Sequence, residues 1–119
     1  MEESQLRTLS KTFARHIILT CRDMKKRKIE SALVDQLLRS GTSVGANIHE
    51  AQHAQGIKDF ISKFEISLKE CNESEYWLEL LFETESINGK TFATLKSECD
   101  SIRKMLISSV VTLKRKTAT

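Results

Sequence analysis

Residues 92–113, FATLKSECDSIRKMLISSVVTL, decide the class of fold. Apolar or small side chains recur there at alternating steps of three and four, in heptad phase, at Phe92, Leu95, Cys99, Ile102, Leu106, Ser109 and Leu113. Most of the charged side chains fall between these positions, so the segment is typical of an amphipathic helix with one apolar stripe. A helix of this kind needs other elements to cover its stripe.

Three earlier segments carry a similar stripe, so the chain predicts four helices. Between about Ser4 and Met24 the stripe is Leu6, Leu9, Phe13, Ile17, Thr20 and Met24. In the segment that begins near Ser31 it is Val34, Leu37, Gly41, Val44, Ile48 and Ala51. In the segment that runs to about Glu85 it is Ile57, Ile61, Phe64, Leu68, Cys71, Leu78 and Phe82.

The joints between these segments are short. The cations Lys25, Lys26, Arg27 and Lys28 end the first helix, where positive charge is favourable. Gly56 is a candidate N-cap of the third helix, with Asp59 as the acidic half of a capping box, and Asn88-Gly89 supplies the last turn. The chain contains no proline, which favours uninterrupted helices. We predict an all-α fold: an antiparallel up-down-up-down four-helix bundle that forms a single domain over residues 1–119.

Charge is distributed unevenly along the chain, although the net charge is only +3. Residues 1–40 carry nine Lys/Arg against five Asp/Glu, residues 41–89 three against nine, and residues 90–119 seven against two. The first and last parts are therefore basic and the middle is acidic. This asymmetry indicates either a polyanionic partner or head-to-tail self-association through opposite charges.

The sequence argues against an enzyme, a metalloprotein and a membrane protein. No apolar run approaches the roughly 20 residues of a membrane span, the polar start is unlike a secretory signal, and three widely spaced cysteines suit free thiols in a reducing compartment. Glu50 and His53 match the Glu-x-x-His spacing of di-iron bundles, but no second copy exists. We expect a cytoplasmic protein with no catalytic residues, no metal and no cofactor.

Two polar stripes lie on the second and third helices, in addition to their apolar stripes. The second helix carries Arg39, Ser43, Asn47 and Glu50 at spacings of four, four and three, and the third carries Glu70, Glu73 and Trp77. Because buried polar groups need partners, these side chains predict a structural hydrogen-bonded network between the two helices. A ligand or partner site is the alternative.

The first helix carries a basic stripe opposite its apolar one. At about 100° per residue, five cations fall within an arc of roughly 80°: Arg7, Lys11, Arg15, Arg22 and Lys25. With Lys26, Arg27 and Lys28 they form a candidate nucleic-acid-binding surface, because aligned cations can track phosphates. The alternative is a solvated face that pairs with the acidic third helix of a neighbouring subunit.

Four branched apolar residues lie off the predicted core stripes: Ile18, Leu19, Ile107 and Val111. A monomeric bundle would leave them in water, so they are a candidate oligomer interface.

The stretch from about Arg39 to Leu81 resembles a known family. Its motifs are TSVGANIHEA at 42–51, DFISK at 59–63, LKE at 68–70 and ESEYWLELL at 73–81. They are similar to the bacterial four helix bundle proteins, also called 23S rRNA intervening-sequence proteins. The usual alanines of that family are Ser67 and Cys71 here, its threonine is Ser74, and its serine cap is Gly56.

This resemblance implies a four-helix bundle that assembles as a ring-like homopentamer without catalytic residues. It also implies partners, since some members are encoded within insertions of large-subunit rRNA genes. A similar protein, the accessory protein of diversity-generating retroelements, binds a reverse transcriptase and nucleic acid.

The sequence therefore favours a homo-oligomeric scaffold that binds RNA, DNA or a reverse transcriptase through its basic surface. The alternative is a purely structural or protein-interaction oligomer without nucleic-acid affinity.

Overall fold

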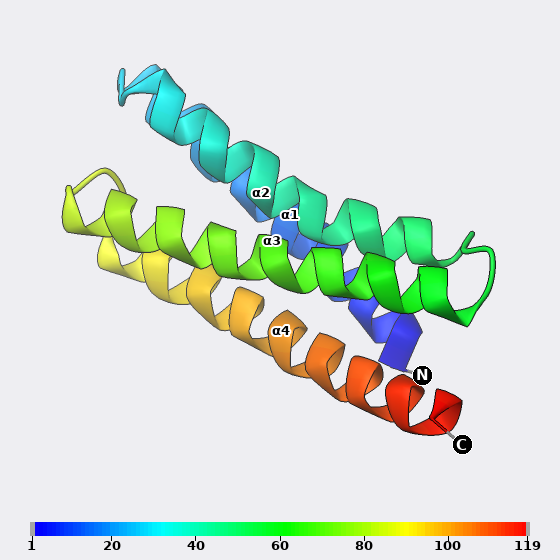
Figure 1. Ribbon diagram of the computed structural model, residues 1–119. Helices are drawn as coiled ribbons and strands as arrows, with labels where there is room; N and C mark the ends of the chain where they lie inside the picture. Colours follow the sequence, from blue (N-terminus) through cyan, green and yellow to red (C-terminus); the bar gives the residue numbers. More distant parts are fainter. Residues whose placement is uncertain (1, 119) are drawn as a thin grey trace.

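The chain folds into four antiparallel helices joined by short loops (Figure 1). The computed structural model describes residues 2–118. Helix α1 spans Glu2–Lys26, α2 Ser31–Ala51, α3 Ile57–Glu83 and α4 Gly89–Thr117. Each helix packs against two neighbours, in the cyclic order α1, α2, α3, α4, and the bundle measures 52 × 22 × 20 Å. The predicted four-helix bundle is confirmed.

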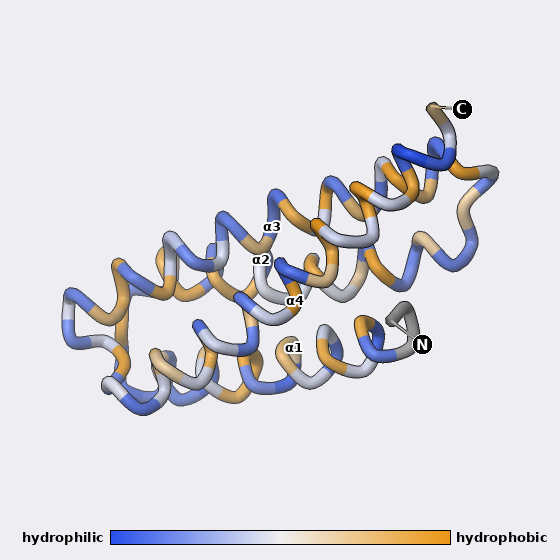
Figure 2. Tube along the Cα trace, turned by 90° about the horizontal axis from the view of Figure 1, so that it is seen from below, coloured by the Kyte–Doolittle hydropathy of each residue, from blue (hydrophilic) through white to orange (hydrophobic). Residues whose placement is uncertain are grey.

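The core follows the apolar stripe of α2 at every predicted position. Val34, Leu37, Gly41, Val44, Ile48 and Ala51 are all buried. Phe13 and Phe64 are the largest of the fully buried side chains. Figure 2 shows hydrophobic and hydrophilic positions interleaved along every helix, as expected where each helix buries one side.

On the other three helices the predicted stripes are wrong at some positions. In α1 Ser10 and Cys21 are buried in place of the predicted Leu9, which is 37% exposed, and Thr20, which is half-buried. In α4 Val110 is buried in place of Ser109. An α-helix has 3.6 residues per turn, so a strict heptad pattern drifts away from the core over several turns.

On α3 the observed stripe also includes smaller side chains than predicted. Ser67, Ser74 and Leu81 are buried, whereas Ile57 and Phe82 are 42% and 40% exposed. The serines are satisfied across the α2–α3 contact, because Ser67 Oγ donates to the Val44 carbonyl at 2.8 Å and Ser74 Oγ donates to Ser40 Oγ at 3.0 Å. Small hydroxyls at the contact let the two helices approach closely, and the hydroxyl donors of Ser67 and Ser74 are both paired.

Two helix ends use a left-handed residue that is not glycine. Lys28 has φ 63°, the Lys28 N–H donates to the Lys25 carbonyl, and the Ile29 N–H donates to the Met24 carbonyl. Glu85 has φ 59° and ends α3 with the same pair of bonds, to Phe82 and Leu81. Both are Schellman motifs, in which glycine is the usual left-handed residue.

Replacing Lys28 with glycine is expected to stabilise the protein by about 1 kcal/mol, because glycine enters this backbone region without steric cost. The loss of a cation near the helix C-terminus offsets roughly a few tenths of a kcal/mol of this gain. Thermal melts measure this change in stability. Lys69→Gly is the control, because glycine in the interior of α3 should destabilise the protein by about 1 kcal/mol. A Lys28→Gly protein that melts below the wild type would contradict the expectation.

Two other predicted joints differ in detail. Asn88 does not form the last turn: its side chain caps α4 by accepting from the Thr91 N–H at 2.8 Å, and Gly89 is already helical. Gly56 is the N-cap of α3, with φ 106°, but Asp59 accepts from the Gln55 N–H at 3.0 Å, one residue before the cap. The left-handed Gly56 backbone turns the chain, so the carboxylate reaches the earlier amide.

Candidate nucleic-acid interface

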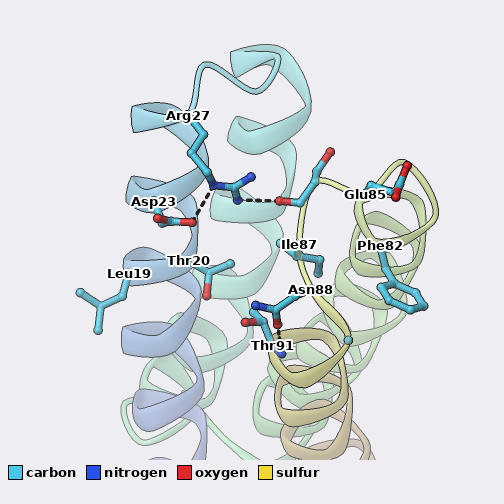
Figure 3. A pocket seen from close by; sticks show the side chains of 11 residues that line it. Leu19, Thr20, Asp23, Arg27, Phe82, Glu85, Ile87, Asn88 and Thr91 are labelled. Atoms are coloured by element: carbon cyan, nitrogen blue, oxygen red, sulfur yellow. Dashed lines mark hydrogen bonds and ion pairs between the residues drawn. The ribbon is translucent and has the colours of Figure 1, made fainter.

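All eight cations predicted as a nucleic-acid surface lie exposed on α1 and on the loop that follows it. Three of them have partners. Lys25 forms an ion pair with Asp35 at 2.6 Å, and Arg15 donates to Thr12 Oγ1 at 3.2 Å. Arg27 donates to Asp23 at 2.9 Å and to the Ser86 carbonyl at 2.6 Å, so it ties the end of α1 to the α3–α4 loop (Figure 3). Arg27 therefore has a structural role in addition to its charge.

Arg7 and Lys11 line a groove between α1 and α2 with a volume of about 670 Å³. The groove exists because small residues meet at its base. A Cβ on Gly45 would lie 3.3 Å from both the carbonyl oxygen and the Oγ of Ser10. The other lining residues are Thr8, Ala14, Thr42, Ala46 and His49. None of these lining residues is acidic, so the groove is a basic concavity.

Two imidazoles stand at the end of α2, beside this groove. The rings of His49 and His53 meet edge to face, with centroids 5.5 Å apart, and both residues are exposed. His49 lines the groove on the α2 side, while Arg7 and Lys11 line it on the α1 side. The sequence alone predicts no role for either histidine on this surface.

The basic residues of α4 are less available than those of α1. Lys96 pairs with Glu75 at 2.7 Å, Arg103 pairs with Asp100 at 2.6 Å and with Glu75 at 3.2 Å, and Lys114 pairs with Glu65 at 2.8 Å. Burial would raise the pKa of Asp100, but the hydrogen bonds from Arg103 and Lys96 outweigh it and hold that pKa below its usual value. The positive charge of residues 90–119 is thus partly neutralised by α3.

The predicted polar network forms only in part. Arg39 bonds across to Glu70 at 3.3 Å and also pairs with Glu73, which accepts from Trp77 Nε1 at 3.2 Å. Ser43 and Asn47 instead donate within α2, to the carbonyls of Arg39 and Ser43 at 2.7 and 2.9 Å, and Glu50 is exposed. Short side chains on a helix reach the carbonyl one turn earlier more easily than a neighbouring helix.

The four apolar residues predicted as an oligomer interface do not form one patch. Leu19 is 59% exposed and lines a pocket of about 770 Å³ beside the α3–α4 loop, as does Phe82 (Figure 3). The Phe82 ring stacks on Phe92. Ile107 and Val111 are exposed one turn apart on α4, and Ile18 is half-buried. Eighteen residues separate Ile107 from the start of α4, about 27 Å along the helix, so the two exposed sites lie toward opposite ends of the bundle.

A family model described as 23S rRNA-intervening sequence protein matches residues 2–108. The chain belongs to this family. A solved structure from Bacteroides thetaiotaomicron, described as a protein with unknown function from the S23 ribosomal protein family, is 42% identical. It superposes with a TM-score of 0.90, over 92% of this chain and 98% of its own. No curated protein matches the chain.

This family membership carries no catalytic assignment, because the matched family and structure name no enzymatic activity. Within residues 2–118, no group of three or more His, Cys, Asp or Glu side chains is arranged to hold a metal ion. Among the same residues, no helix combines the length and hydropathy needed to cross a membrane. The basic concavity between α1 and α2 is the candidate site for a nucleic acid, because its walls carry Arg7 and Lys11.

Proposed function

We propose that the protein is a non-catalytic, homo-oligomeric scaffold that binds nucleic acid through the basic face of α1. The carrying observation is the groove in which Arg7 and Lys11 stand exposed and no lining residue is acidic. Phosphate contacts supply most of the affinity of non-specific nucleic-acid binding, and they require cations that are free to reach the backbone.

The placement of ion pairs supports α1 over α4 as the binding face. Several α4 cations are held by acids of α3, whereas Arg7, Lys11 and Arg22 have no ionic partner among the described side chains. A cation without an ion-pair partner can bind a phosphate without first breaking an ion pair within the protein. Its contribution to the binding affinity is therefore not reduced by that loss. A polyanion should therefore bind along α1.

The two separated apolar sites support self-association. If both patches are buried in an oligomer, the simplest symmetric arrangement packs the first patch of each subunit against the second patch of the neighbouring subunit. Head-to-tail contacts of this kind close into rings when the rotation between subunits allows it. We propose that Leu19 and the pair Ile107 and Val111 take part in such contacts, with five subunits as the family resemblance implies.

The combined substitution Arg7→Gln, Lys11→Gln and Arg15→Gln should weaken nucleic-acid binding and flatten its dependence on salt. Each phosphate contact contributes up to about 0.9 to the slope of log affinity against log salt, so three lost contacts per bound subunit reduce the slope by up to about 2.7. Titrations at several salt concentrations measure this slope. Circular dichroism should show unchanged helicity, because all three side chains are exposed.

The matched control neutralises three exposed cations elsewhere: Lys58→Gln, Lys69→Gln and Lys104→Gln. It removes the same net charge from α3 and α4. Equal weakening by both triple variants would show a general charge effect and contradict the assignment to α1. If micromolar wild-type protein binds neither DNA nor RNA at low salt, the proposed nucleic-acid binding is wrong. The alternative, a scaffold without nucleic-acid affinity, is then favoured.

In sedimentation at micromolar concentration we expect an oligomer several times the chain mass of 13.6 kDa. Ile107→Lys with Val111→Lys should shift the protein toward the monomer, because lysine at a buried interface is costly to desolvate. The control is Lys104→Gln, an exposed change on the same helix. A wild-type protein that sediments as a single species of chain mass would refute self-association.

A further inference from the structure

The size of the α1–α2 groove bears on which form of nucleic acid could enter it. Its volume of about 670 Å³ lies within the roughly 300–1,000 Å³ typical of pockets that enclose small molecules. A base in a duplex is stacked and paired, so it can enter such a concavity only at a cost of a few kilocalories per mole. A base in a single strand is already available for insertion.

The floor of the groove is made of small residues that offer few polar groups to a ligand. Ala14 and Ala46 carry only methyl groups, and Gly45 carries no side chain. Two of the three hydroxyls that line the groove are already used within their own helices, since Ser10 Oγ donates to the Arg7 carbonyl at 3.2 Å and Thr42 Oγ1 donates to the Leu38 carbonyl at 2.7 Å. Contacts with a ligand therefore come from the walls.

The two walls offer complementary chemistry. On α1, Arg7 and Lys11 lie one turn apart, about 6 Å along the axis, and present cations. On α2, His49 presents an exposed ring that His53 supports edge to face at 5.5 Å. Cations beside an aromatic ring are the combination by which proteins hold single strands without strong sequence preference, with phosphates on the cations and a base on the ring.

We propose that this groove is a single-stranded nucleic-acid site, in which Arg7 and Lys11 hold phosphates and His49 stacks on an unpaired base. The proposal rests on the proposed function and deepens it, because it assigns the form of nucleic acid and the residue that recognises it. RNA and DNA share the chemistry involved, so both are expected to bind as single strands.

The test compares labelled single strands with duplexes of the same sequence, in both DNA and RNA, by fluorescence anisotropy at fixed salt. Wild-type protein should bind the single strand about tenfold or more tightly than the duplex, a difference within the range of base–aromatic stacking. His49→Ala should weaken single-strand binding about tenfold and leave duplex binding nearly unchanged. Ala46→Leu, which fills the groove from an exposed position, should remove the preference with the cations intact.

Two controls separate the groove from the rest of the surface. Ala93→Leu places the same extra volume at an exposed position on α4, and Tyr76→Ala removes an exposed aromatic ring of α3 that lies outside the groove. Both should retain the single-strand preference. Loss of the preference in Tyr76→Ala but not in His49→Ala would overturn the assignment.

The outcomes for this site and for the proposed function are distinguishable. Equal affinity for single strands and duplexes, unchanged by Ala46→Leu but reduced by the Arg7, Lys11 and Arg15 substitutions, overturns the groove site and leaves the basic face of α1 standing. No binding of any nucleic acid overturns both.

Discussion

Phe64→Ala is expected to lower the free energy of unfolding by about 3–5 kcal/mol, the largest effect of any single substitution considered for this bundle. Phe64 is fully buried in the core and packs against Phe60, with ring centroids 4.5 Å apart. Truncation to alanine removes the ring from the apolar interior and leaves a cavity that surrounding helices fill only in part. Chemical denaturation monitored by the far-ultraviolet helical signal measures the loss.

Ile66→Ala is the matched control, two residues away on the same helix. Ile66 is 39% exposed, so its truncation creates no enclosed cavity and should cost roughly 1 kcal/mol or less. Comparable losses in the two variants would mean that Ile66 is covered in solution, for example by another subunit, and that the core does not dominate stability at Phe64.

Gly41→Ala is expected to destabilise the bundle by about 1–3 kcal/mol, although alanine is the better helix former. A Cβ at position 41 would lie 2.8 Å from Cγ1 and 2.9 Å from Cγ2 of Ile17. These atoms branch directly from the Ile17 Cβ, so they cannot move aside without a change of rotamer or a shift of the α1 backbone. The helix-propensity gain of about 1 kcal/mol offsets only part of this strain.

A double-mutant cycle checks the cause of that strain. Ile17→Ala removes the atoms that a new Cβ would meet, so Gly41→Ala should cost less in the Ile17→Ala background than in the wild type. Gly89→Ala serves as the control for glycine replacement, since its Cβ would meet Phe82 at an ordinary distance of 3.9 Å. Strictly additive effects of Gly41→Ala and Ile17→Ala would reject close α1–α2 packing as the reason for Gly41.

The helices and their order could be predicted from the sequence because periodic apolar residues and an absence of proline leave few alternatives. The stripe of α2 was predicted at every position, since its side chains are buried on a single side. The sequence misplaced Leu9 and Ser10 because hydrophobicity alone ranks leucine above serine as a core residue. Close packing against Gly45 favours the smaller side chain there, and this depends on the distance between two helices.

The candidate site was only partly visible in the sequence. The cations of α1 could be placed on one face from helical periodicity, and their exposure agrees with that placement. The groove could not be predicted, because it depends on which residues of α2 lie opposite Arg7 and Lys11. The motif TSVGANIHEA, which contains Gly45, Ala46 and His49, carries the family resemblance, but its spacing alone does not predict a concavity.

The three buried cysteines allow opening of the bundle to be measured by thiol labelling. Cys21, Cys71 and Cys99 are each at most 2% exposed, and burial raises the pKa of the Cys21 thiol to about 11. A thiol reagent can therefore attack only molecules in which the helices have separated, because the reactive thiolate must form and be reached. When closing is fast relative to labelling, the labelling rate measures the population of open molecules, residue by residue and without denaturant.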